Sequence, residues 1–164
     1  GPVGQMIRQI FKGRMKFQED PAGFDRQMAY LFAADRYDHL YNDTDGIEPM
    51  MNRGYSIIST RYYFSSFAYH CSTPKSWELV ERLNADFPQP TLLVYLRNSV
   101  DESMKRLTSR PTLDSYETED KLQLVSNNYE RIVGEYPGAK LILDAKQSPT
   151  QIHEAIANRL KDLL

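Results

Sequence analysis

The sequence predicts an α/β domain in which a parallel sheet carries helices on both faces. Three short apolar runs are typical of fully buried strands, and they lie at Tyr55–Thr60, Thr91–Leu96 and Leu141–Ala145. Segments with helical spacing or helix caps alternate with them. Strands buried on both faces are continuous apolar runs, and their alternation with helices is typical of parallel sheets. The length of 164 residues and the mass of 19.0 kDa fit one domain, residues 1–164.

Helices are predicted from apolar spacing and from capping residues. From Val3 to Phe11 the apolar residues recur at i, i+3, i+4, i+7 and i+8, which places them on one helical face. Asp20 before Pro21 is a typical N-cap followed by proline at the first helical position. The predicted helices run from about Val3 to Phe11, from Pro21 toward Leu40, from Ile47 to Arg53, from Pro74 to about Phe87, from Ser99 toward Arg110, from Tyr116 to about Tyr136, and from Ser148 through Leu163.

Composition and charge exclude several classes of protein. The net charge of −2 and the pI of about 5.9 give no global positive field that would attract nucleic acid or an anionic membrane. An anionic ligand must therefore be held by a few placed arginines. Cys71 is the single cysteine, which permits no internal disulfide and favours a reducing cytoplasm. The longest apolar runs are too short to span a bilayer, and no signal segment begins the sequence.

The ligand site is expected beyond the carboxyl ends of the strands, where open α/β sheets bind their ligands. The informative residues should therefore follow Ser59, Leu96 and Asp144. The first of these places is occupied by the segment from Thr60 to Ser66, which is dense in polar and aromatic side chains. The sequence thus predicts that this segment contributes to a binding site.

Two segments together resemble the thymidylate kinase family: Leu31–Leu40 (LFAADRYDHL) and Gly54–His70 (GYSIISTRYYFSSFAYH). The family pattern is LFxAxR on a helix, then a strand that ends in DRY, then SSxAYQ. Asp114–Glu117 (DSYE) and residues 143–149 (LDAKQSP) fit in the same order, so the resemblance covers nearly the whole chain. It implies a P-loop NTPase-type three-layer α/β/α fold. It also implies a cytoplasmic homodimer that phosphorylates dTMP to dTDP with ATP and Mg²⁺.

The resemblance further implies the residues of a dTMP pocket. Phe32 would stack on the thymine ring, and Arg36, four residues later on the same helical face, would donate to a base carbonyl. From the residues alone, the spacing favours a core position for Phe32 and a solvated surface position for Arg36, and only the motif favours the pocket. The implied substrate-binding residues are Phe32, Arg36, Arg61, Ser65, Ser66, Tyr69 and His70.

The segment after the first strand would hold the phosphate and the sugar. Arg61 lies where a guanidinium can clamp a monophosphate in bidentate fashion. Ser65 and Ser66 would open the next helix and offer hydroxyl and backbone N–H donors, or serve as plain N-caps. Tyr69 would lie against the sugar and disfavour a 2′-hydroxyl, unless it is only a half-buried aromatic residue.

A lid at about residues 107–115 is expected to act on the transferred phosphate. Phosphoryl transfer spreads negative charge over the transferring oxygens, and a mobile arginine stabilises that charge. The resemblance assigns Arg61, Arg106 and Arg110 to catalysis, and Arg106 and Arg110 also to ATP binding. Arg110 could instead be an ordinary loop arginine. No protein-ligated metal is predicted.

The sequence departs from the family most clearly at the ATP-phosphate loop. Such a loop reads GxxxxGK[ST] after a strand, and no such string occurs in this sequence. In the family it follows a first strand that lies between the strands resembling Tyr55–Thr60 and Thr91–Leu96. Without that strand both neighbours would carry unpaired buried backbone groups. We therefore expect the natural protein to have roughly 35–45 further N-terminal residues, about one strand, loop, helix and strand.

Two substitutions within the motifs leave three interpretations open. Thr60 stands where the family usually has aspartate, and a neutral hydroxyl is a poorer ligand for Mg²⁺. His70 stands where glutamine is common. The chain is therefore expected to be a dTMP kinase, a kinase of the same fold for another nucleoside monophosphate, or a non-catalytic nucleotide-binding protein that keeps the monophosphate pocket.

Overall fold

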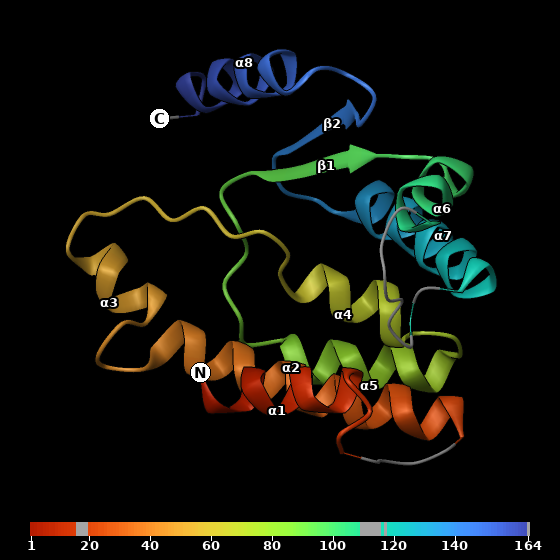
Figure 1. The fold of residues 1–164 in the computed structure, drawn as a ribbon. Helices are drawn as coiled ribbons and strands as arrows, with labels where there is room; N and C mark the ends of the chain where they lie inside the picture. Colours follow the sequence, from red (N-terminus) through yellow and green to blue (C-terminus); the bar gives the residue numbers. More distant parts are fainter. Residues whose placement is uncertain (16–19, 109–115, 117, 164) are drawn as a thin grey trace.

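A computed structural model describes residues 1–15, 20–108, 116 and 118–163 of the chain. The described residues form a helix-rich α/β structure with a small parallel sheet (Figure 1). Along the chain the elements are α1 (Pro2–Phe11), α2 (Pro21–Tyr41), α3 (Ile47–Asn52), α4 (Tyr63–His70), α5 (Pro74–Asn84), β1 (Leu93–Arg97), α6 (Val100–Thr108), α7 (Glu119–Glu135), β2 (Lys140–Asp144) and α8 (Pro149–Lys161).

The predicted helix starts are confirmed by their side-chain caps. Asp20 accepts hydrogen bonds from the backbone N–H of Gly23 at 2.8 and 3.0 Å, so α2 begins at Pro21. Thr73 with Ser76 forms a capping box that starts α5, and Ser148 with Gln151 forms another that starts α8. These caps satisfy N–H groups that a helix leaves without partners in its first turn.

The sheet pairs β1 with β2 in parallel, which agrees with the predicted α/β class. Leu93 lies opposite Lys140 and Arg97 opposite Asp144, so both strands end at the same edge. Helix α8 packs against β2, and α7 contacts β1 through a Tyr95–Tyr129 ring stack with centroids 5.7 Å apart. The carboxyl ends of both strands therefore lie side by side, where β1 leads into α6 and β2 leads toward α8 (Figure 1).

The prediction of a strand at Tyr55–Thr60 is wrong for the described residues. Residues 55–59 run as irregular chain without ladder partners, and Ile58 is 89% exposed. A strand exists only where a neighbour completes its hydrogen bonds. The predicted topology places that neighbour between this segment and β1, and no described residue occupies this place, because β1 pairs with β2 alone.

Several predicted boundaries also shift. Helix α4 begins at Tyr63, so Ser65 and Ser66 lie in its first turn and do not open it. Helix α5 ends at Asn84 rather than near Phe87, and α7 begins at Glu119 because Thr118 caps it. The apolar residues of α8 are half-buried rather than buried, and β2 is the described element with which α8 has its main contact.

Helix α2 lies between two apolar clusters and holds them together. On one side Met28, with no exposed surface, packs with Ile7 and Ile10 of α1 and with Tyr116. On the other side Ala29 packs with Cys71 and Val80. Adjacent residues of one helix thus face two different packing partners. No helix in the described part of the chain has the length and apolar character that a membrane crossing requires.

Candidate functional site

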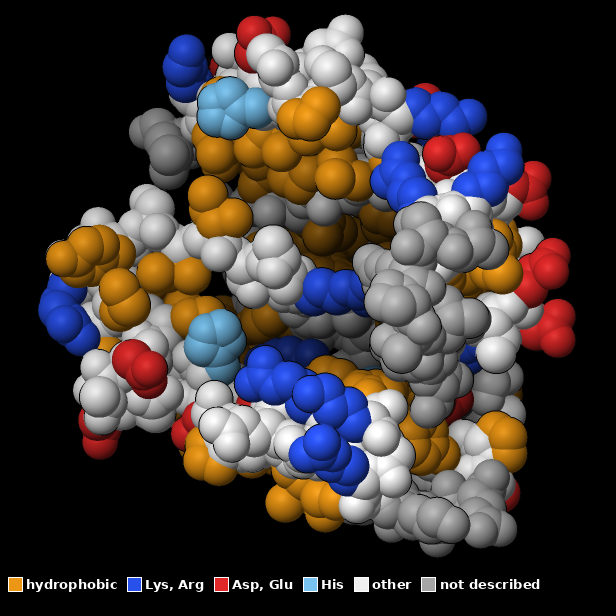
Figure 2. Space-filling view, viewed as in Figure 1, with side chains coloured by type: hydrophobic (Ala, Val, Ile, Leu, Met, Phe, Trp, Pro, Cys, Tyr) orange, Lys and Arg blue, Asp and Glu red, His pale blue; other side chains and the backbone are white. Residues whose placement is uncertain are grey.

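A pocket of about 790 Å³ opens between α2, α4 and the end of α6. Ligand pockets commonly have volumes of ~300–1,000 Å³, so this one is large enough for a nucleotide. Figure 2 shows the hollow from its open side, with apolar surface inside and Lys or Arg side chains near its mouth. All seven residues that the sequence predicted for substrate binding line it: Phe32, Arg36, Arg61, Ser65, Ser66, Tyr69 and His70.

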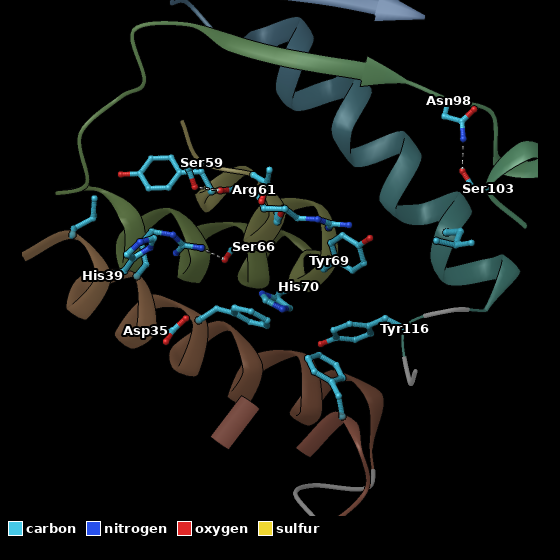
Figure 3. Close-up of a pocket in the computed structure, with 18 of the residues that line it drawn as sticks. Asp35, His39, Ser59, Arg61, Ser66, Tyr69, His70, Asn98, Ser103 and Tyr116 are labelled. Atoms are coloured by element: carbon cyan, nitrogen blue, oxygen red, sulfur yellow. Dashed lines mark hydrogen bonds between the residues drawn. The ribbon is translucent and has the colours of Figure 1, made fainter. Parts of the chain in front are cut away.

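Aromatic rings form one wall of the pocket (Figure 3). Phe32 stacks on His70, with ring centroids 5.5 Å apart and planes inclined by 29°. Phe11 lies 6.4 Å from Phe32, and Tyr116 lies 6.1 Å from His70. These rings come from α1, α2, α4 and the segment before α7, so the wall is made by distant parts of the sequence. A planar, apolar surface of this kind suits a nucleobase.

His70 contributes two buried ring nitrogens to this wall. The residue is 3% exposed, and neither ring nitrogen has a hydrogen-bond partner among the residues that the structure describes. Burial, together with the positive charges of Lys121 and Arg36, lowers the pKa of His70 to about 3. The neutral imidazole presents one donor and one acceptor, and a polar ligand edge would satisfy them.

Arg36 reaches the pocket from α2 with neutral partners. Its guanidinium donates to Oδ1 of Asn84 and, over 3.1 Å, to Oγ of Ser66. The rings of Tyr62 and Phe87 lie 5.7 and 5.6 Å from it. Burial lowers the pKa of Arg36 to about 10, so the side chain remains charged at neutral pH. Ser66 is 2% exposed and serves as an acceptor for Arg36 rather than as an N-cap.

Arg61 approaches the same pocket from the loop before α4. Its backbone has φ 74°, a left-handed conformation that costs a non-glycine residue about 1–2 kcal/mol. Its carbonyl accepts a hydrogen bond of 2.8 Å from Ser59 Oγ, and its guanidinium lies 5.1 Å from the ring of Tyr69. Burial of the guanidinium lowers the pKa of Arg61, but the hydroxyls of Tyr69 and Tyr129 raise it more. Arg61 as a whole is exposed to solvent, but its side chain lines the pocket.

Two residues that support the arginines were missed by the sequence analysis. Tyr129 of α7 shares a 2.8 Å hydrogen bond with Ser65, and its hydroxyl also interacts with Arg61. Asn84, the last residue of α5, accepts from Arg36. Neither lies in a recognisable motif, and 48 residues separate Asn84 from Arg36. Only the tertiary structure reveals these contacts.

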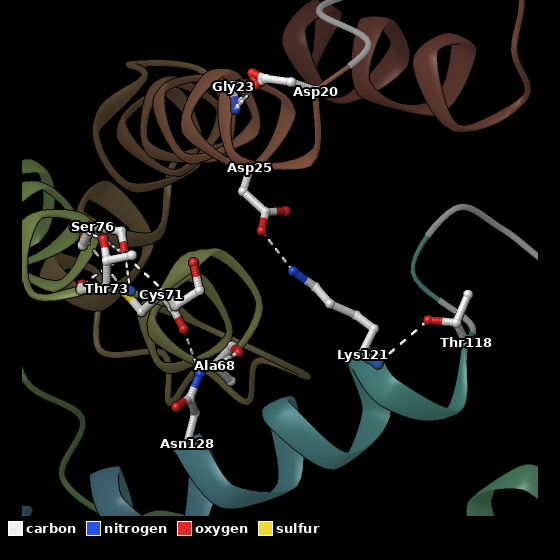
Figure 4. A network of polar contacts seen from close by, with 11 residues as sticks. Asp20, Gly23, Asp25, Ala68, Cys71, Thr73, Ser76, Thr118, Lys121 and Asn128 are labelled. Atoms are coloured by element: carbon white, nitrogen blue, oxygen red, sulfur yellow. Dashed lines mark hydrogen bonds and ion pairs between the residues drawn. The ribbon is translucent and has the colours of Figure 1, made fainter.

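Helix α7 fixes the position of α4 (Figure 4). Asn128 donates to the backbone carbonyls of Ala68 and Cys71 over 2.9 and 2.8 Å. Lys121 forms an ion pair of 2.7 Å with Asp25 of α2, and both side chains are largely buried. Because α4 carries Ser65, Ser66, Tyr69 and His70, these contacts also hold the pocket together.

Of the two predicted lid arginines, Arg106 lies among the described residues and Arg110 does not. Arg106 lies on α6, is exposed, lines the pocket and forms an ion pair of 3.9 Å with Glu102. Arg110 falls outside the described residues, as does the lid from 109 to 115. The lid residues 107 and 108 form the end of α6. The structure thus brings Arg106 to the pocket and leaves the position of Arg110 untested.

A second hollow of about 380 Å³ lies at the carboxyl ends of β1 and β2. Asn98 lines both hollows, so they adjoin each other. No group of three His, Cys, Asp or Glu side chains in the described ranges could hold a metal ion. Thr60 lines the larger pocket with a neutral hydroxyl. The described side chains alone therefore do not fit Mg²⁺, which prefers carboxylates and phosphate oxygens.

Comparison with known proteins gives one consistent result. A family model described as thymidylate kinase matches residues 1–156. A probable thymidylate kinase of Pyrobaculum aerophilum is 32% identical over 98% of this chain and 78% of its own length. One from Thermococcus onnurineus is 33% identical over 93% of this chain and 74% of its own length. A putative thymidylate kinase of Treponema pallidum is 29% identical over 99% of this chain and 77% of its own length.

The buried ion pair between α2 and α7 should matter more than an exposed one. Replacing Asp25 with alanine leaves Lys121 buried without its partner, so the free energy of unfolding should fall by about 3–5 kcal/mol. Glu135→Ala, which breaks the exposed Arg131–Glu135 pair on α7, should cost no more than about 0.5 kcal/mol. Urea unfolding measures both. Equal losses would contradict the structural role of the buried pair.

His70 should make the protein less stable in acid. Its pKa of about 3 lies below the unfolded value of 6.5, so the unfolded state takes up the proton first. Its contribution to stability is therefore complete above pH 6.5 and is lost as the pH falls toward 3, by up to about 1.4 kcal/mol per pH unit. The variant His70→Gln should show a flatter decline in the free energy of unfolding between pH 6.5 and 4. Parallel curves would disprove a buried neutral His70.

Proposed function

The chain belongs to the thymidylate kinase family, and from this premise we propose that it transfers the γ-phosphoryl group of ATP to dTMP in the pocket between α2 and α4. Of the three interpretations that the sequence left open, this one has the support of relatives over nearly the whole chain. The products are dTDP and ADP. A phosphate oxygen of dTMP forms the new bond to phosphorus as the bond from phosphorus to the β–γ bridging oxygen breaks.

One observation carries the proposal: two arginines of the pocket, Arg36 and Arg61, have neutral hydrogen-bond and ring partners. Within the described residues neither Arg36 nor Arg61 forms an ion pair with a carboxylate. Arg36 contacts Asn84, Ser66 and aromatic rings, and Arg61 contacts tyrosines. Their charges therefore remain available to a ligand. Two available cations beside an aromatic wall match a nucleotide, which joins a planar base to an anionic phosphate.

The base would occupy the inner part of the pocket. We assign Phe32 to stacking on thymine and Arg36 to a hydrogen bond with a base carbonyl, because both line the pocket from α2 and lie one helical turn apart. The orphaned nitrogens of His70 and the hydroxyl of Ser66 lie in the same part and would serve the remaining polar edge of the base. Tyr69 would lie against the sugar, where its ring leaves less room for a 2′-hydroxyl.

The monophosphate would lie at the outer part, beside Arg61. The guanidinium neutralises charge on the acceptor phosphate, which eases its approach to the anionic γ-phosphate. Ser65 adds a hydroxyl, which Tyr129 orients. Arg106 lines the pocket from α6 and would stabilise charge on the transferring group, with Arg110 in the same role. ATP would enter from the adjoining hollow at the ends of β1 and β2. Mg²⁺ would come with the phosphates of ATP.

A homodimer is supported by aromatic surface on α2. Tyr30 and Tyr37 are 51% and 61% exposed, and they lie seven positions apart on one helical face. Exposed aromatic residues gathered on a helix are typical of protein interfaces.

The variant Tyr37→Glu should shift the mass measured by light scattering after gel filtration from dimer to monomer, because it buries a charge in the interface. A monomeric wild type would disprove this proposal.

The intact protein should release ADP from ATP with dTMP faster than with any other common nucleoside monophosphate. A coupled assay with each monophosphate in the presence of Mg²⁺ measures this directly. Release with a different monophosphate would favour the second interpretation. Folded protein that binds dTMP but releases no ADP would favour the third.

Arg61→Ala should lower kcat/KM for dTMP by at least about 100-fold, because it removes a charge-assisted contact with the monophosphate. Arg53→Ala is the matched control, since Arg53 is an exposed arginine that donates to the carbonyl of Pro49 and does not line the pocket. Its kinetics should stay within about twofold of the wild type. A similar loss in both variants would remove Arg61 from the phosphate site.

A further inference from the structure

Asn84 is a buried side chain whose polar atoms are both engaged. The residue ends α5, is 6% exposed and does not line the pocket. Its Nδ2 donates to the carbonyl of Val80 over 2.6 Å within the same helix. This contact fixes the orientation of the amide, so its Oδ1 faces away from α5 and accepts from Nη1 of Arg36. The amide therefore has one available arrangement.

Arg36 is held from several directions at once. Ser66 of α4 accepts from Nη2 over 3.1 Å, while Tyr62 and Phe87 flank the guanidinium. A guanidinium has five N–H donors in a rigid plane, and these contacts use two of them. Asn84 and Ser66 come from different helices, so together they set the plane of the group and not only its position. Because Arg36 lines the pocket, a fixed plane also limits the directions in which its remaining donors can reach a ligand.

The neutrality of Asn84 is as important as its position. An aspartate has nearly the same shape, but it would form a charge-assisted, bidentate pair with the guanidinium and compensate its charge. Asparagine accepts a hydrogen bond and leaves the charge for the ligand. Bases differ at the position that this charge would meet: thymine carries an oxygen acceptor at C4, and cytosine carries an amino donor there.

We propose that Asn84 is a positioning residue that orients Arg36 toward the 4-carbonyl of thymine and so sets the preference for dTMP over dCMP. The inference rests on the proposed function of the pocket. It adds a residue outside the pocket that determines specificity through another side chain.

The test is calorimetric titration of the intact protein with dTMP and with dCMP. Wild type should prefer dTMP. In Asn84→Ala the guanidinium loses one fixed contact, so dTMP binding should weaken about 10-fold while dCMP binding changes less than about twofold. Asn84→Asp keeps the shape, and should weaken dTMP binding by about 10- to 100-fold because the new carboxylate competes for Arg36. The ratio of the two affinities should fall in both variants.

Asn42→Ala provides the control for stability. Asn42 ends α2, the helix that carries Arg36, and makes only local contacts there: it donates to Asp38 and accepts from Thr44 and Asp45. This variant should lower the melting temperature and keep the wild-type ratio of affinities.

Three results would overturn the inference. If Asn84→Ala lowers the melting temperature but keeps the preference for dTMP, Asn84 only fills space. If Asn84→Ala does not fold, an unchanged ratio in Asn84→Asp has the same meaning. A folded wild type that binds no dTMP would overturn the proposed function and this inference together, whereas binding without a change in the ratio overturns only the inference.

Discussion

The geometry of the pocket depends on one buried amide, that of Asn128. A helix leaves the carbonyls of its last turn without partners inside the helix, so the end of α4 needs hydrogen-bond donors from elsewhere. Asn128 satisfies the carbonyls of Ala68 and Cys71 from the neighbouring helix α7. Tyr69 and His70 lie between those two carbonyls in the sequence. The placement of both rings therefore follows from a residue that touches neither the pocket nor its ligand.

Among the described residues, Arg36 and Arg61 form no ion pair with a carboxylate, whereas several other cations do. Lys121 pairs with Asp25, Arg97 with Glu130, and Arg131 with Glu135, all between or along helices and strands outside the pocket wall. The net charge of the whole chain is −2, yet the pocket presents arginines that have neutral partners. Net charge thus says little about this site, because the pairing of individual residues decides which charges a ligand meets.

The sequence was sufficient where local chemistry decides the outcome. Asp20 and Ser148 cap helices at the predicted places, and motif spacing brought Phe32, Arg36 and Arg61 to one pocket. It was insufficient where partners come from elsewhere. The segment 55–60 has strand-like composition but no ladder neighbour among the described residues, and the supports Asn84 and Tyr129 belong to no local pattern. Contacts across 48 or 64 positions are fixed by packing, which no short window of sequence contains.

The link between Asp25 and Lys121 spans 96 positions, and it has a consequence for the order of folding. Contacts between distant positions require long loops to close and therefore form slowly. During synthesis the N-terminal helices emerge first, and α1, α2, α4 and α5 can associate before α7 exists. Until α7 arrives, the end of α4 has no Asn128 and Arg61 has no Tyr129. An incomplete chain would thus carry every residue of the pocket motifs and still lack a formed binding site.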